Sequence, residues 1–215
     1  MPPRRAVRPL ALLVAALASA CAGVLPGPRE APPRTYLLAP ALAGGGSRPS
    51  VRASGPTLLV SPVESAAGFD TRRMAYLERD YRLDYFADHA WVDSPAAMLG
   101  PLLVQVLSGS GAFAAVTGET RGIAADLRLD TVVESLYQDF RTRPSVVRVT
   151  LRVSLADANG RALLATRTLE DSEPAATDDP YGGVVAANRV LSRLLPQIAA
   201  FAAESGRQSR PGSDE

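Results

Sequence analysis

His89 is the only histidine in the sequence, and this restricts both nucleophilic catalysis and metal binding. A Ser-His-Asp triad needs a serine close to the imidazole ring, yet no Gly-x-Ser-x-Gly motif occurs. The nearest approach is Ser108-Gly-Ser110-Gly111, which is typical of a glycine-rich turn that ends a helix. A hydrolase that uses Ser108 or Ser110 with His89 therefore stays an alternative, and we expect His89→Ala to leave function intact.

Metal, phosphate and glycoside chemistry have little support in the sequence. Metal sites usually draw on several His or Cys ligands, and Asp178-Asp179 lacks the spaced oxygen ligands of a calcium loop. There is no lysine, so a Gly-x-x-x-x-Gly-Lys phosphate loop is excluded. Nothing brings together two carboxylates for glycoside hydrolysis from the acidic cluster Asp70, Glu78, Asp80, Asp84 and Asp88. We predict a chain without metal, cofactor or enzymatic activity.

Cys21 is the only cysteine, and its surroundings predict a covalent modification. It follows Ala18, Ser19 and Ala20, an order similar to the lipobox whose cysteine receives diacylglycerol in bacterial lipoproteins. A lipobox usually has leucine three positions before the cysteine, whereas here Leu17 stands four positions before it. A lone free thiol is a liability in an oxidising compartment, whereas a thioether-linked cysteine is inert. The sequence therefore predicts lipidation of Cys21; the alternative is an ordinary secretory signal that is cut after Ala20.

The first 20 residues predict where the protein works. An arginine-rich start precedes an apolar run at residues 10–17, which is too short to span a bilayer comfortably and is typical of a signal peptide over residues 1–20. Several acyl chains would hold the mature protein stably at a membrane, because one chain alone binds reversibly. The second mature residue is Ala22 rather than Asp, which favours the outer membrane. We expect a lipid-anchored outer-membrane protein with its folded part in the periplasm.

The mature chain divides into a spacer, one domain and a tail. The lipidated cysteine begins a proline-rich spacer at residues 21–33, which predicts an extended segment of at most about 40 Å. Residues 34–204 are enough for a single domain, with a glycine-rich flexible loop at 41–56, and residues 205–215 predict a disordered polar tail. Without residues 1–20 the chain has 20 basic and 22 acidic residues, so no basic excess attracts nucleic acid.

Two helices follow from helical spacing of apolar residues and from their start signals. Ser94 is a good N-cap with Pro95 in the first turn, and apolar residues then recur to Leu107, before Gly109 ends the helix. Asp179 and Pro180 start the second helix, whose apolar stripe runs to residue 202.

Strands are predicted at seven places, most clearly at residues 147–155, where apolar and polar residues alternate. Asn159-Gly160 then predicts a tight turn and an antiparallel return, whose edge could also pair between copies in a homo-oligomer. The seven ranges are 34–40 (an edge strand), 57–61 (a buried strand), 73–76 with 81–86 (a hairpin), 126–137, 147–155 and 161–170. On the exposed face, Arg148 and Arg152 are expected to lie across from Asp130 and Glu134.

Aromatic residues concentrate between residues 76 and 91, and two interpretations stay open. In the first, Tyr85, Phe86 and Trp91 anchor the core beneath the first helix and His89 bonds to backbone. In the second, the segment is a protein-binding surface, because aromatic residues concentrate where protein contacts are strongest. The candidate partner surface consists of Tyr76, Tyr81, Tyr85, Phe86, His89 and Trp91.

Several segments, in order, resemble the ABC-type transport auxiliary lipoproteins, which accompany MCE-type lipid transport systems of Gram-negative bacteria. The likeness runs from about Tyr36 to Phe201. The matching segments are Tyr36-Leu-Leu-Ala-Pro40, Leu58-Leu-Val-Ser-Pro62, Arg73-Met-Ala-Tyr76, Tyr85-Phe-Ala-Asp-His-Ala-Trp91, Pro95-Ala-Ala-Met-Leu99 and Tyr181-Gly-Gly-Val-Val-Ala-Ala-Asn188.

The resemblance implies a mixed β-sheet with helices packed against it; we expect an α/β fold of about five or six strands with two main helices packed on the sheet. It also implies a non-catalytic periplasmic partner of an MCE-type transporter that moves phospholipid or a related apolar lipid across the envelope. Only Cys21 takes a role from the family, that of the lipidated residue. A structural or assembly lipoprotein of the envelope, without a transport role, is the alternative function.

Overall fold

The computed structural model describes residues 32–42, 55–118, 124–159 and 161–208. The chain divides into two units, Met1–Pro32 and Pro33–Glu215, and all of the described strands and helices lie in the second. The predicted signal peptide, Cys21 and the spacer up to residue 31 lie outside the described residues, as do residues 43–54 of the predicted loop.

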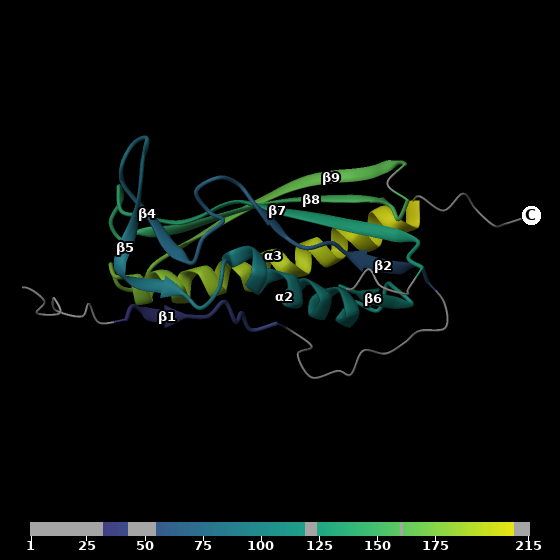
Figure 1. Cartoon of the computed structure of the whole chain (residues 1–215), viewed down its shortest axis with the longest axis horizontal. Coiled ribbons are helices and arrows are strands. Elements are labelled where there is room, and N and C mark those ends of the chain that lie inside the picture. The colour runs from purple at the N-terminus through teal and green to yellow at the C-terminus, as the bar shows by residue number, and fades with distance from the viewer. Residues whose placement is uncertain (1–31, 43–54, 119–123, 160, 209–215) are drawn as a thin grey trace, which may run out of the picture. The chain divides into compact units, whose positions relative to one another are not determined.

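Nine strands and two helices make up the described part (Figure 1). The strands are β1 (Arg34–Tyr36), β2 (Thr57–Val60), β3 (Glu64–Ser65), β4 (Arg73–Arg79), β5 (Arg82–Trp91), β6 (Ala115–Thr117), β7 (Leu127–Asp139), β8 (Val146–Asp157) and β9 (Leu163–Pro174). The helices are α2 (Pro95–Gly109) and α3 (Pro180–Gln208). The predicted mixed α/β fold with two helices is confirmed, but the count of five or six strands is wrong. The missed strands β3 and β6 are two and three residues long, too short to show a period.

The long strand β7 organises the sheet. Along one edge it pairs antiparallel with β8, which pairs antiparallel with β9. Along its other edge it meets three parallel partners in succession, β2 near its start, β3 in its middle and β4 at its end. Strand β4 continues through the antiparallel β5 to the parallel edge strand β1, and β2 continues to β6. The sheet is therefore continuous on the β9 side and branches on the other.

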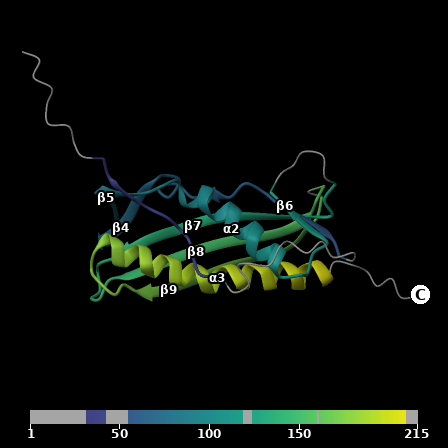
Figure 2. The same ribbon diagram turned by 90° about the horizontal axis from the view of Figure 1, so that it is seen from below.

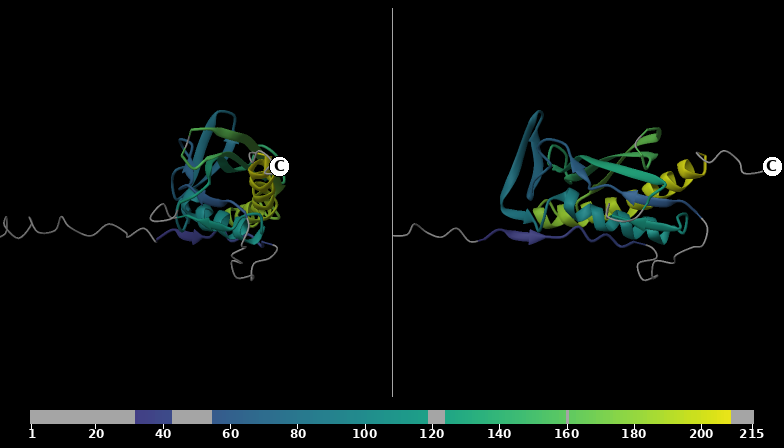
Figure 3. Two further views of the ribbon diagram at one scale, coloured as in Figure 1. Left: turned by 90° about the vertical axis from the view of Figure 1, so that its right-hand side faces the viewer. Right: turned by 45° about the vertical axis from the view of Figure 1, so that its right-hand side comes forward.

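Both helices pack on one face of this sheet, as Figure 2 and the left view of Figure 3 show. The predicted alternation holds: Leu127, Leu129 and Val133 of β7 are buried toward the helices. A bulge between Val133 and Ser135 then changes which residues face inward, so that Leu136 and Gln138 are buried beyond it. The largest fully buried side chains are Leu58, Leu99, Leu103, Leu107, Leu129, Leu151, Leu155, Leu191, Leu194, Leu195, Ile198 and Val133.

Helix ends follow the predicted caps, with one correction at the C-terminus. The Ser94 hydroxyl accepts a hydrogen bond from the Ala97 N–H at 3.3 Å, and Asp179 Oδ1 accepts one from the Gly182 N–H at 2.7 Å. Helix α3 continues to Gln208, so the predicted tail boundary at residue 205 is wrong. The reason is packing, because Gly206 is buried where its missing side chain lets Leu127 approach.

The predicted β4–β5 hairpin is present and longer than expected. It turns at Asp80 and Tyr81, where Tyr81 has a φ of 64°. Strand β5 runs ten residues back to Trp91, so most of the aromatic segment lies on one strand. The right view of Figure 3 shows this hairpin standing away from the helices, with its turn far from β1. The hairpin therefore carries side chains from the base of the fold to an exposed tip.

Candidate functional site

Six rings from four elements and one turn form a continuous row at the hairpin end of the domain. Neighbouring ring centroids lie 4.5–6.3 Å apart along the row. We call this set the ring row: Tyr181 of α3, Tyr36 of β1, His89 and Phe86 of β5, Tyr76 of β4 and Phe140 just after β7. All of its members are half-buried except Tyr181, which is exposed.

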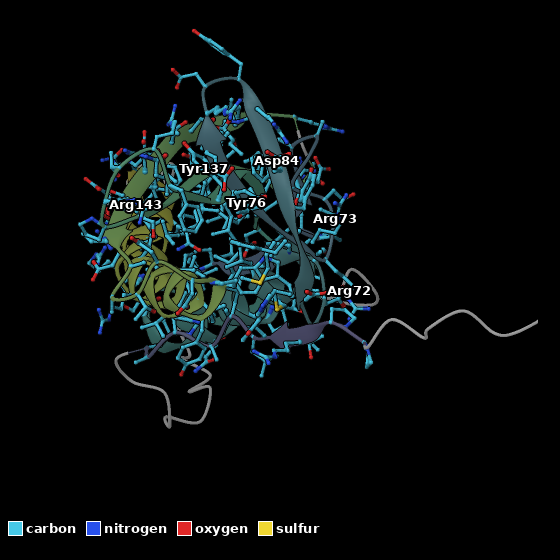
Figure 4. The ribbon with its side chains drawn as sticks, turned by 90° about the vertical axis from the view of Figure 1, so that its left-hand side faces the viewer. Arg72, Arg73, Tyr76, Asp84, Tyr137 and Arg143 are labelled. Carbon is cyan, nitrogen blue, oxygen red and sulfur yellow. The ribbon has the colours of Figure 1, made fainter. Side chains whose placement is uncertain are left out.

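The ring row continues the core-facing side of the sheet beyond the start of α3. Tyr76 pairs with Asp84, so Tyr76 and Phe86 share a face of the hairpin, and their rings lie 4.5 Å apart. The same face carries the buried Met74 two residues before Tyr76. Figure 4 views this end, with Tyr76 near its middle and Arg72 and Arg73 at its outer edge. Helix α3 begins at this end of the sheet and does not cover the rings fully, so they stay half-buried.

His89 has a side-chain partner, not the predicted backbone partner. Its Nδ1 and the Tyr36 hydroxyl are hydrogen-bonded at 2.9 Å. The two rings are also stacked, with centroids 5.7 Å apart and planes 7° from parallel. This contact ties the edge strand β1 to β5, and it gives the only histidine a packing role.

The six predicted surface residues do not form one patch. Tyr76, Phe86 and His89 come together in the ring row, whereas Trp91 is buried in the core. Tyr85 lies on the other face of the hairpin, where its ring is 4.1 Å from the Arg73 guanidinium carbon and its hydroxyl donates to the Gly68 carbonyl. Tyr81 stands alone at the tip and is fully exposed. Of the three predicted core anchors, Trp91 is buried while Tyr85 and Phe86 are half-buried, and the protein-binding interpretation stays a prediction.

Sequence reasoning missed three members of the ring row, Tyr36, Phe140 and Tyr181. Each is an aromatic residue at or just beyond the end of an element, and all three are distant in sequence from the hairpin. Tyr36 and Tyr181 stand at the start of segments that carry the family resemblance, which was the only signal available.

The serine–histidine alternative receives no support from the geometry. Ser110 lies beyond the C-terminal end of α2, and its hydroxyl donates to the Leu107 carbonyl at 2.6 Å. His89 lies just before the opposite end of this 15-residue helix, which is about 22 Å long. Among the described residues, no three His, Cys, Asp or Glu side chains are grouped to hold a metal ion. No helix in that part of the chain has the length and apolar character to cross a membrane.

Two hollows lie near apolar side chains. One is a cavity of about 20 Å³ between the hairpin base and α3, lined by Phe86, Trp91, Gln138 and Gly183, among others. It has room for about one water molecule, so it is no pocket for an acyl chain. The other is an open groove of about 460 Å³ between α2 and β2, next to Pro62, Pro101 and Val104.

A buried carboxylate holds the other side of the hairpin. Asp139, at the end of β7, is 1% exposed and accepts hydrogen bonds from Arg141 at 2.8 and 2.9 Å and from Arg148 at 3.2 Å. Arg141 also pairs with Asp80 at the hairpin turn. The prediction that Arg152 pairs with Glu134 is confirmed at 2.7 Å, but Arg148 contacts Asp139 and not Asp130. The hydrogen bonds from Arg141 are the main reason that the pKa of Asp139 is lowered to about 2.

Asp139→Asn should lower the free energy of unfolding at pH 7 by about 2 kcal/mol. The native pKa is depressed, so the unfolded chain binds more protons in acid. The ion-pair stabilisation is present above about pH 4 and is lost as the pH falls to about 2. Urea denaturation at pH 7 and at pH 3 should therefore show a smaller difference between the two proteins at pH 3. The exposed Asp88→Asn should cost less than about 0.5 kcal/mol at pH 7, and an equal cost in both variants would contradict this account.

Comparison with known proteins agrees with this fold. The family model for the ABC-type transport auxiliary lipoprotein component matches residues 36–199. Protein XCC0632 from Xanthomonas campestris has a similar structure, with a TM-score of 0.70 at 19% identity, covering 81% of this chain and 98% of its own. An uncharacterized protein of known structure follows at a TM-score of 0.59 and 17% identity, with the same coverage. No curated protein matches the sequence.

The family match spans the domain from β1 through most of α3, and it includes every member of the ring row. The structural likenesses are at low sequence identity and extend to the fold alone. The chain belongs to the family of ABC-type transport auxiliary lipoprotein components.

Proposed function

We propose that this protein is a non-catalytic lipoprotein of the outer membrane that serves an MCE-type ABC transport system for phospholipid or a related apolar lipid. Cys21 carries the lipid, and the folded domain lies in the periplasm as a docking partner of the transporter. The family match is the observation that carries this proposal. The half-buried ring row and the projecting hairpin support it, because they give the domain a surface suited to a protein partner.

The hairpin tip is the strongest candidate for the contact with the transporter. Tyr81 holds a left-handed backbone conformation, which costs a bulky residue roughly 1 kcal/mol, and its side chain is fully exposed. Ion pairs hold both sides of the turn, Asp80 to Arg141 and Arg82 to Asp84 at 2.8 Å. An exposed aromatic side chain on a turn held by ion pairs fits an anchor for a pocket on a partner, since the backbone that carries it loses little freedom when it binds.

Photo-cross-linking in cells tests this proposal. Benzoylphenylalanine in place of Tyr81 or Tyr76 should give an adduct with an MCE protein, identified by mass spectrometry. The same replacement at Leu163, another exposed apolar residue, at the start of β9, serves as the control. Tyr81→Ala should weaken recovery of the MCE protein roughly tenfold, and Leu163→Ala should not.

The outcomes separate this function from the alternative. Adducts with secretion or assembly components, and none with a transporter, would favour a structural envelope lipoprotein. Deletion of the gene should make the envelope sensitive to detergent, and a resistant envelope without any transporter adduct would overturn the transport role.

A further inference from the structure

Large apolar side chains are exposed together around one point of the described fold. Leu37 is 59% exposed, Val92 42% and Tyr181 61%. All three surround Tyr36: Leu37 follows it in the chain, the Val92 N–H donates to its carbonyl at 2.8 Å, and the Tyr181 ring lies 6.3 Å from its ring. We call Tyr36, Leu37, Val92 and Tyr181 the β1 patch. The other two large exposed apolar residues, Tyr81 and Leu163, lie at the hairpin tip and at the far end of β9.

The chain enters the domain at this patch. Arg34 is the first residue of β1, and Cys21 lies 13 residues before it in the sequence. A spacer of that length reaches about 40 Å when extended. A lipid on Cys21 would therefore confine the β1 side of the domain to the neighbourhood of the bilayer, where even weak contacts form at high effective concentration.

The side chains of the patch fit the boundary between lipid and water. Tyrosine is enriched there because its ring is apolar and its hydroxyl is polar, and Leu37 and Val92 add aliphatic surface. The charged neighbours are of both signs, without a basic excess: Arg34 and Arg72 against Asp88, Asp93 and Asp179, all exposed. Figure 4 shows Arg72 at this base, beside β1. Apolar contact, rather than attraction to anionic headgroups, would therefore dominate.

We propose that the β1 patch rests on the surface of the membrane that holds the lipid anchor; this inference depends on the proposed lipidation of Cys21. The patch fixes the orientation of the domain as well as its distance from the bilayer. Strand β5 runs ten residues from Trp91, which precedes Val92 of the patch, to the turn, a length of about 33 Å. In Figure 1, β1 and the hairpin tip lie on opposite sides of the domain. Tyr81 then points away from the membrane, toward a periplasmic partner.

Single-cysteine labelling of the full lipidated protein tests this inference. Leu37→Cys, Tyr181→Cys and the control Leu163→Cys are labelled with an environment-sensitive fluorophore and reconstituted in phosphatidylethanolamine–phosphatidylglycerol vesicles. Labels at 37 and 181 should shift to shorter emission wavelengths and be quenched by spin-labelled lipids, with neither effect at 163. The shift should persist in high salt, because the patch has no basic excess to attract anionic headgroups.

The controls separate the anchor from the patch. The parent protein should resist thiol labelling, because Cys21 is its only cysteine and would be lipidated. A parent that labels and stays in the soluble fraction overturns the anchor, and the docking with it. An anchored protein whose labels at 37 and 181 behave like the label at 163 overturns the docking alone. Labels at 37 and 181 that shift in emission but are not quenched by spin-labelled lipids also overturn the docking. A second copy of the protein would then cover the patch.

A surface variant gives a second readout. Leu37→Asp with Tyr181→Asp should abolish the emission shift of a label on Val92→Cys, while the membrane-bound fraction and the thermal midpoint stay unchanged. An unchanged shift in that variant would contradict the proposal.

Discussion

Gly182→Ala should lower the free energy of unfolding by about 3 kcal/mol. Gly182 lies in the first turn of α3, where an added Cβ would fall well inside 3.0 Å of the Thr177 carbonyl oxygen. Real Cβ atoms essentially never come that close, and the obstacle is backbone, which cannot rotate aside. The Asp179 cap that bonds the Gly182 N–H holds the same turn in place. Relief of the clash therefore requires the start of the longest helix to move.

Gly109→Ala is the matched control, because it makes the same change at the last residue of α2, which no proline follows, with the opposite expected sign. Nothing lies within 4 Å of the position that its Cβ would take. Alanine should therefore stabilise α2 by roughly 0.5–1 kcal/mol, the usual gain over glycine in a helix. Urea denaturation of both variants measures the two effects. Equal effects of the two substitutions would show that the contact with Thr177 is not the cause.

The regular part of the fold could be predicted from local patterns. Alternation at residues 147–155 gave β8, and the serine and aspartate caps gave the starts of α2 and α3. The bulge in β7 could not be predicted, because nothing in the sequence marks the point after Val133 where the inward positions change. Arg148 meets Asp139 and not Asp130 because the register places Asp130 opposite Ser154, six residues from Arg148 along β8.

The candidate site could be predicted only in part. Composition identified the aromatic segment, and its residues occupy β4 and β5 as a hairpin. Which face each residue takes depends on the irregular pairing between Arg73 and Ala75, which local patterns do not record. The ring row also needs Tyr36 from a parallel edge strand and Tyr181 from the start of α3, and such contacts between distant segments arise only from tertiary packing.

Cys21→Ser should move the protein from the membrane fraction to the soluble periplasm almost completely. Each buried acyl CH₂ contributes about 0.8 kcal/mol, so several chains hold a protein stably, while none of the described helices is suited to span a bilayer. The β1 patch alone is small, and without the anchor it also loses the high local concentration that the spacer provides. Fractionation of cells with blotting measures the distribution.

The serine variant keeps the fold, and this makes the test specific. Residue 21 lies outside the domain matched by the family, which starts at Tyr36, so the thermal midpoint should be unchanged. Ser19→Ala, in the same segment, leaves the cysteine in place and should leave the protein at the membrane. If the serine variant also stays at the membrane, then the domain is held there by its surface or by a partner. The spacer would then lose its role as a tether, and the orientation of the hairpin would have to come from the transporter itself.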